Sequence, residues 1–282
     1  MEIIENLSDL DLINKYRPLA LIPTMGNLHE GHLGLIKYAL KLNLSPMVTI
    51  FVNPLQFGPA EDFSKYPRTI EEDLRLLKKE KCNLVFIPDG KKILENIKEL
   101  KAPFSNFLCS KSRPGHFDGV LTIVNRFLEL IKPEYCIFGQ KDFQQQLIIK
   151  EHLKNSELST KLITNPIIRD KNGLALSSRN NYLSKRDKLK AAKIYFYLKE
   201  ISAELIKVIL NKNDFKKELD FLKSSYREIF LKENFEVDYL EFVNAKTLED
   251  LKKKDSEILI AVAINYAGVR LIDNIFLTRP IS

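Results

Sequence analysis

Short apolar runs alternate with helical patterns along the first 168 residues, and this alternation constrains the fold more than any other feature. The apolar runs are LALI (19–22), MVTIFV (47–52), NLVFI (83–87), YCIFG (135–139) and KLITNPII (161–168). Segments with apolar residues at helical spacing lie between them, near 31–43, 70–80, 119–131 and 142–154. A strand–helix repeat of this kind predicts an α/β domain, a parallel sheet with helices on both faces. We expect this domain to span residues 1–172.

The character of the sequence changes from about residue 184. Two amphipathic helices are predicted over 184–210 and 214–233. Segments rich in Val, Ile, Tyr and Phe follow, and the dipeptide AG separates the last two; they are 235–245, 258–269 and 270–277. We therefore expect a smaller C-terminal α+β domain with an antiparallel sheet, over residues 173–282, that closes over the site of the first domain.

Composition excludes some classes of protein. The chain has 282 residues, of which 45% are hydrophobic and 29% charged, so it can build a normal core. No apolar run reaches the roughly eighteen residues that a membrane helix needs. The acidic N-terminus lacks the basic start of a secretion signal. The odd number of widely spaced cysteines (82, 109 and 136) indicates a reducing compartment and fits no zinc site. We expect a cytoplasmic protein without a membrane contact.

The formal charge is +7, and most of the excess is lysine interleaved with acids in helical segments. This pattern favours a solvated surface over a nucleic-acid site, and no aromatic-plus-basic RNA motif or zinc finger is present. We expect no specific nucleic-acid partner.

The segment PTMGNLHEGHLG joins the first apolar run to the first helical pattern. A strand-to-helix turn points backbone N–H groups and the positive end of the helix dipole at a ligand, which favours an anion. His29 and His32 are three residues apart and so share one face of a helical turn. The glycines at 26, 31 and 34 are expected to let a ligand approach the backbone. The residues alone leave open phosphate chemistry, a metal pair, and a histidine used only as a helix cap.

Polar residues also follow the second and fourth apolar runs. Asn53 and Gln56 begin a Gly- and Pro-containing loop whose length suits a lid, and amides suit a ligand with hydroxyl and carboxylate groups. Lys141 is predicted at the positive end of a helix, where the dipole disfavours a cation, so an anionic ligand is expected there. Asp142 is predicted to cap that helix.

In two further segments a structural role competes with a functional one. His116 lies in RPGHFDG, and we favour a structural role in which its imidazole is bonded locally. Ser177, Ser178 and Arg179 group two hydroxyls with a guanidinium, which is a common way to hold phosphates. The alternative for SSRN is a helix cap.

Taken together, five segments resemble the pantoate–β-alanine ligase (pantothenate synthetase) family, in order and at plausible spacing: PTMGNLHEGH, FVNPLQFGPAEDFSKYPRT, RPGHFDGV, FGQKDFQQ and GLALSSRN. HEGH is also similar to the HxGH motif of the wider nucleotidylyltransferase superfamily, and LSSR to its second phosphate-binding signature. The resemblance implies a Rossmann-like first domain and the ATP-dependent condensation of pantoate with β-alanine through a pantoyl adenylate. Pyrophosphate and AMP are the other products, Mg²⁺ accompanies the nucleotide, and the protein is a homodimer through its N-terminal domains.

Two alternatives to this function remain. One is a nucleotidylyltransferase of the same superfamily that keeps the nucleotide on its product. The other is a basic protein that binds nucleic acid weakly and with strong salt dependence.

The resemblance also implies roles for individual residues. It makes His32, His29, Lys141 and Arg179 catalytic, and it assigns pantoate and β-alanine to Gln56, Gln145 and Asn53. The implied ATP-binding residues are Met25, Gly26, Asn27, Leu28, His29, Glu30, Gly31, His32, Gly139, Gln140, Lys141, Asp142, Ile168, Leu176, Ser177, Ser178 and Arg179. Protein ligands of Mg²⁺ are not assigned. Three positions depart mildly from the family, which often has Glu, Met and Val at Gln140, Leu176 and Ile168.

Overall fold

The computed structural model describes residues 1–59, 61, 63–211 and 214–279, and the chain divides into two compact units. The first unit consists of Met1–Ser105 and Ser110–Ile168, and the second of Asn106–Cys109 and Arg169–Ser282. The division along the chain thus lies between residues 168 and 169, beside our expected boundary at 172/173. In addition, a short segment from the first half of the chain belongs to the second unit.

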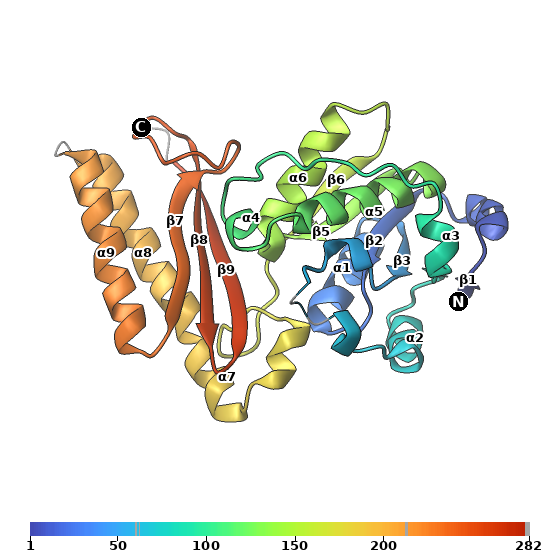
Figure 1. The fold of residues 1–282 in the computed structure, drawn as a ribbon, viewed down its shortest axis with the longest axis horizontal. Coiled ribbons are helices and arrows are strands. Elements are labelled where there is room, and N and C mark those ends of the chain that lie inside the picture. The colour runs from blue at the N-terminus through green and yellow to red at the C-terminus, as the bar shows by residue number, and fades with distance from the viewer. Residues whose placement is uncertain (60, 62, 212–213, 280–282) are drawn as a thin grey trace. The chain divides into compact units, whose positions relative to one another are not determined.

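A six-stranded parallel sheet in the order β1–β4–β3–β2–β5–β6 is the centre of the first unit (Figure 1). Its strands are β1 (Glu2–Ile4), β2 (Leu19–Thr24), β3 (Ser45–Ile50), β4 (Leu84–Phe86), β5 (Tyr135–Gly139) and β6 (Lys161–Asn165). The predicted parallel sheet is confirmed, and β1 is an additional edge strand. The strand order changes direction between β2 and β5, and ligands of such sheets bind at this switch point, outside the carboxyl ends of the strands.

Helices cover both faces of this sheet, as predicted. The helices of this unit are α1 (Glu30–Lys41), α2 (Ile70–Lys79), α3 (Gly90–Leu94), α5 (His116–Ile131) and α6 (Phe143–Lys154), and the short α4 (Cys109–Ser112) begins in the segment that belongs to the second unit. On one face, Leu33 and Ile36 of α1 pack in a cluster with Ile22 and Val48 of the strands. On the other face, the ring of Phe127 in α5 meets that of Phe86 edge-on, with centroids 6.1 Å apart. Short 3₁₀ turns connect these elements, and they are η1 (Leu7–Tyr16), η2 (Pro54–Gln56), η3 (Phe63–Lys65) and η4 (Gln140–Asp142).

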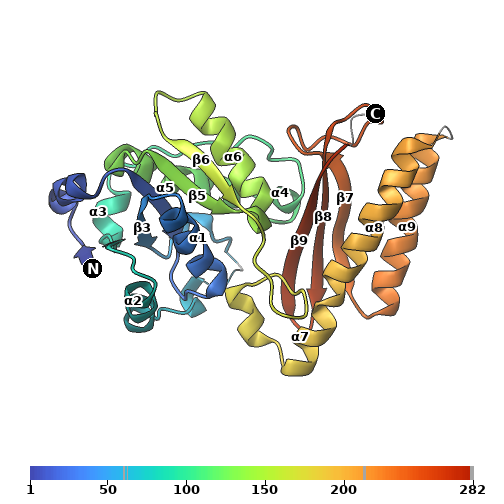
Figure 2. The same ribbon diagram turned by 180° about the vertical axis from the view of Figure 1, so that it is seen from behind.

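The second unit packs two long helices on one face of a three-stranded antiparallel sheet (Figure 2). Its elements are η5 (Ser178–Tyr182), α7 (Lys185–Ala191), α8 (Lys193–Leu210), α9 (Phe215–Lys232), β7 (Glu236–Asn244), β8 (Glu257–Tyr266) and β9 (Val269–Thr278). Ala267 and Gly268, with φ of 50° and 75°, form the tight turn between β8 and β9 that the AG dipeptide indicated. The predicted helix over 184–210 is interrupted at Ala192, between α7 and α8. None of the described helices is both long enough and apolar enough to cross a membrane.

Candidate functional site

The turn between β2 and α1 lies at the switch point of the sheet. Gly26 and Asn27 adopt φ of 77° and 49°, in the left-handed region that glycine and asparagine tolerate best. A Cβ atom at position 26 would lie 2.9 Å from Oδ2 of Asp73, so a larger residue would also displace the carboxylate below the turn. The glycine at 26 thus serves the fold of the turn itself.

Asp73 of α2 holds this turn from the interior of the unit. Its side chain accepts hydrogen bonds from the backbone N–H groups of Asn27 at 2.9 Å and Leu28 at 2.7 Å, and from the Thr69 hydroxyl at 3.2 Å. Burial raises the pKa of this carboxyl, and the three hydrogen bonds oppose that rise. Asp73 was not among the predicted site residues. The sequence gives one indication of its role: Asp73 is a charged residue four positions before Leu77, so it lies on the apolar side of the helix.

The imidazole rings of His29 and His32 are held through the same ring nitrogen, Nδ1. Nδ1 of His29 accepts from the N–H of Gly31 at 3.0 Å and caps α1, and Nδ1 of His32 lies 3.4 Å from the N–H of His29. Because both Nδ1 atoms accept, each neutral ring carries its proton on Nε2. The ring centroids are 4.1 Å apart. The helix cap, which the sequence left as one alternative, is therefore formed. It uses the Nδ1 atoms and leaves the Nε2–H group of each ring outside the cap.

Burial and a nearby cation keep both rings neutral. Burial, followed by the positive charge of Lys141, lowers the pKa of His29 to about 4. Burial also lowers the pKa of His32 well below its usual value, with His29 and Lys141 acting in the same direction. Lys141, in the segment after β5, thus lies close enough to lower the pKa of the two histidines in the segment after β2, as the strand order predicts.

Gly139 ends β5, and the turn η4 leads from it into α6. Asp142 occupies the N-cap position of α6 but makes no side-chain cap hydrogen bond, so the predicted cap is wrong. The reason is that Asp142 has φ of −91° and ψ of 56° at the end of a 3₁₀ turn, whereas a capping aspartate needs extended backbone.

Gln56 in η2 is held at both ends of its amide. Nε2 donates to Sδ of Met25 at 3.0 Å, and Oε1 accepts from Nδ2 of Asn53 at 3.1 Å. Asn53 is only 1% exposed, and it also donates to the carbonyl of Gly119 at 3.0 Å and accepts from the N–H of Leu55 at 3.2 Å. In this arrangement Asn53 supports Gln56, whereas we expected it to contact a substrate, and that contact stays a prediction.

The side chain of Gln145 has no bonded partner among the described residues, whereas that of Ile168 is packed against a helix. Gln145 lies in the first turn of α6 and is half-buried, and its amide makes no hydrogen bond to any residue that the structure describes. Ile168 lies against α1, since a Cβ atom at position 34 would be 1.8 Å from its Cδ1 atom. The expectation that Gly34 admits a ligand is therefore wrong, because the side chain of Ile168 occupies that space.

The predicted residues Leu176, Ser177, Ser178 and Arg179 belong to the second unit. Oγ of Ser177 accepts from the N–H of Arg179 at 3.3 Å and caps η5, so the cap that we gave as the alternative is formed. Their contact with phosphate stays a prediction.

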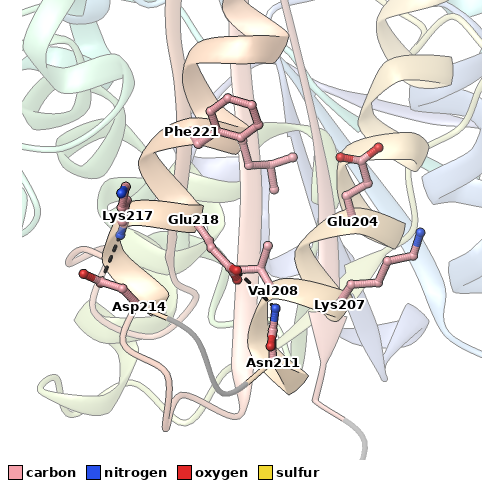
Figure 3. Close-up of a pocket in the computed structure, with 9 residues that line it drawn as sticks. Glu204, Lys207, Val208, Asn211, Asp214, Lys217, Glu218 and Phe221 are labelled. Carbon is pink, nitrogen blue, oxygen red and sulfur yellow. Dashed lines mark hydrogen bonds between the residues drawn. The ribbon is translucent and has the colours of Figure 1, made fainter.

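A separate pocket of about 810 Å³ lies within the second unit, between α8 and α9 (Figure 3). Acidic, basic and apolar side chains line it together: Glu204, Lys207, Val208, Asn211, Asp214, Lys217, Glu218, Phe221 and Leu222. None of the predicted site residues is among them. The candidate site is accordingly at the switch point of the first unit and not at this pocket.

Comparison with known proteins places the whole chain in a family. The family described as pantoate-beta-alanine ligase matches residues 2–276. The pantothenate synthetase of Acetivibrio thermocellus is 41% identical, over 98% of this chain and 99% of that protein. The crystal structure of pantothenate synthetase from Thermus thermophilus superimposes with a TM-score of 0.85 and 32% identity, over 98% of this chain and 99% of that one. The crystal structure of pantoate-beta-alanine ligase from Francisella tularensis, solved with beta-gamma ATP and beta-alanine, gives a TM-score of 0.75 and 33% identity, over 98% of this chain and 97% of that one.

Proposed function

Because the chain belongs to the pantoate–β-alanine ligase family, it is an ATP-dependent ligase that joins pantoate to β-alanine, and we propose that the switch-point residues carry the chemistry. The observation that supports this most is the pair of neutral histidines beside Lys141. Their Nδ1 atoms are used by the backbone, so their Nε2–H groups are donors.

In the first step, a carboxylate oxygen of pantoate bonds to the α-phosphorus of ATP, and the bond to pyrophosphate breaks. Negative charge builds on the phosphate oxygens as this happens. Two preorganised N–H donors and one ammonium group, from His29, His32 and Lys141, stabilise that charge without taking a proton.

In the second step, the neutral amine of β-alanine bonds to the acyl carbon of the pantoyl adenylate, and the bond from that carbon to the phosphate oxygen of AMP breaks. The proton that the nitrogen loses passes to the departing AMP or to solvent. No bond between substrate and protein is needed, so no protein nucleophile with its activating base is required. Gln56 and Gln145 orient pantoate, because an amide can accept from a hydroxyl and donate to a carboxylate. Orientation matters since the attacking oxygen must approach phosphorus in line and at close range.

Mg²⁺ is part of the proposal as the companion of ATP. Among the described residues, no group of three or more His, Cys, Asp or Glu side chains could hold a metal ion. This fits Mg²⁺, which keeps several waters and binds substrate phosphates rather than a dedicated protein cage. When bound, the ion neutralises phosphate charge.

The family membership supports three finer statements about this chain. Leu176–Arg179 bind the phosphates of ATP. The working form is a homodimer, and the compartment is the cytoplasm.

The test is an assay of the released products. The protein is incubated with ATP, Mg²⁺ and pantoate, with and without β-alanine. Pyrophosphate release should require ATP and pantoate, and AMP release should require β-alanine in addition. A product that retains the nucleotide would instead identify a nucleotidylyltransferase.

A further inference from the structure

RPGHFDG is the one predicted motif to which the proposed function gives no role. Its His116 begins α5, and Nδ1 of the ring lies 2.8 Å from the carbonyl oxygen of Gln56. Nε2 lies 2.9 Å from a terminal nitrogen of Arg113. Because a guanidinium only donates and a carbonyl only accepts, the ring carries its proton on Nδ1. The contact with Arg113 is local, as expected for this ring, whereas the other bond ends on the backbone of Gln56, 60 residues away in the chain.

Glu61 fixes the cation that holds this ring. The guanidinium of Arg113 donates to the two carboxylate oxygens of Glu61 at 2.8 and 2.7 Å. This hydrogen bonding holds the pKa of Glu61 below its usual value. A bidentate pair sets the plane of a guanidinium as well as its position. Glu61 and Arg113 together therefore set the orientation of the His116 ring.

The backbone of η2 packs directly on α5 beside this ring. A Cβ atom at Gly119 would lie 2.1 Å from the carbonyl oxygen of Leu55 and 2.6 Å from the backbone nitrogen of Gln56. Gln56 is thus held at its backbone by His116 and the α5 surface. Its side chain is held by Asn53 and Met25.

We infer that His116 is a positioning residue for the acid substrate, that it acts through Gln56, and that Arg113 and Glu61 support it. The inference rests on the proposed function, in which Gln56 contacts pantoate. A displaced amide would orient the pantoate carboxylate poorly. A residue that served only stability would lower the unfolding free energy but would not change the use of one substrate more than the other.

Two substitutions of His116 separate these roles. The amide nitrogen of Asn in His116→Asn takes the place of Nδ1 and can still donate to the Gln56 carbonyl. Phe in His116→Phe keeps the ring that lies edge-on to Phe117, with centroids 4.8 Å apart, but cannot donate. We expect His116→Phe to raise KM for pantoate on the order of tenfold, the scale of one lost hydrogen bond, with KM for ATP unchanged. His116→Asn should lie closer to the unsubstituted protein.

Two further variants serve as support and control. Glu61→Gln leaves the ring intact and weakens only its support, so a smaller rise in KM for pantoate is expected. It also keeps the test available if His116→Phe does not fold. His152→Phe is the matched control, because His152 is another half-buried histidine of the first unit, bonded to Asn125 at 2.7 Å, and should leave KM for pantoate unchanged.

Gln56→Ala, measured alongside, distinguishes the ways in which the inference can fail. If Gln56→Ala raises KM for pantoate while His116→Phe and Glu61→Gln do not, the inference is overturned and the proposed function stands. An equal rise in KM for both substrates in His116→Phe also overturns it. If Gln56→Ala itself leaves KM for pantoate unchanged, the proposed contact of Gln56 fails, and the inference fails with it.

Discussion

Gly34 and Ile168 approach so closely that a methyl group at position 34 would lie 1.8 Å from Cδ1 of Ile168. Gly34→Ala should therefore push the end of the Ile168 side chain out of place. The overpacking cost of about 1–3 kcal/mol should exceed the gain of about 0.5–1 kcal/mol from alanine inside a helix, so the unfolding free energy should fall. Because the family resemblance implies that Ile168 binds ATP, KM for ATP should rise more than KM for pantoate. Steady-state kinetics and urea unfolding measure the two effects.

The double variant Gly34→Ala, Ile168→Val provides the control, because valine lacks the Cδ1 atom that clashes. It should recover much of both losses. A double variant no better than Gly34→Ala alone would place the strain elsewhere.

Lys141→Ala and His32→Ala should each slow pyrophosphate release on the order of a hundredfold, the scale of one lost charge-stabilising donor. Lys141→Ala should also let the pKa of His29 rise from about 4, because the Lys141 charge is one cause of its lowering. Rapid-quench kinetics measure the rate, and NMR titration of the imidazole measures the pKa. A near-normal rate in either variant would require new roles for these residues.

The low pKa of His29 predicts that the protein loses stability as the pH falls. Between an ordinary value of 6.5 and the folded value of about 4, the unfolded chain binds a proton that the folded chain does not. The unfolding free energy should then decrease with falling pH, by at most about 1.4 kcal/mol per pH unit for one such group. His32 contributes with the same sign, since its pKa is also lowered.

His29→Asn isolates this effect, because an asparagine oxygen can still accept the N–H of Gly31 while the titration is removed. Urea unfolding near pH 7 and near pH 5 should show a shallower pH dependence for the variant. An unchanged dependence would mean that His29 takes up a proton in the folded protein as readily as in the unfolded chain.

Asp73→Asn tests whether the turn between β2 and α1 depends on the buried carboxylate. One carboxylate oxygen becomes an NH₂ group, which then faces a backbone N–H of Asn27 or Leu28. The expected cost is about 1–3 kcal/mol in unfolding free energy, with a clear rise in KM for ATP. Thr69→Val is the control, since it removes only the hydroxyl bond to the same carboxylate. If KM for ATP were equal in the two variants, the turn would not depend on Asp73.

Gln145→Ala should weaken the use of pantoate without weakening ATP binding. The adjacent Gln146→Ala is a matched control, because Gln146 is 8% exposed and its Oε1 atom accepts from the Thr164 hydroxyl. The control should lower stability and leave the pantoate dependence intact. Calorimetry of ATP binding and pyrophosphate release against pantoate concentration separate these effects. If Gln145→Ala weakened ATP binding and the use of pantoate equally, Gln145 would have a structural role.

Buried parallel strands were predictable because each is a short continuous apolar run, as in LALI and YCIFG. The edge strand β1 was not, since Glu2–Ile4 is too short to show a pattern. The long helices were predicted to within a few residues because their apolar spacing is regular. The interruption at Ala192 leaves that spacing unbroken and so gave no signal.

The location of the candidate site was predicted from topology, because the carboxyl ends of neighbouring parallel strands meet. That rule identifies residues after strands, such as His29 and Lys141. It cannot identify Asp73, which reaches the turn from within a helix. Nor can it show what occupies the space beside a glycine. The space beside Gly34 is filled by Ile168, which lies more than a hundred residues later in the chain.

The segment Asn106–Cys109 belongs to the second unit although the residues on either side of it belong to the first. Within the second unit, Sγ of Cys109 lies 3.1 Å from the hydroxyl oxygen of Tyr239 and accepts from Arg270 at 3.5 Å. A gene cut between codons 168 and 169 would therefore not yield two self-contained polypeptides. The C-terminal product would lack part of its own fold, and the N-terminal product would carry that part as a loop. Split versions of this ligase, or exchange of its second unit with a relative, have to include that loop.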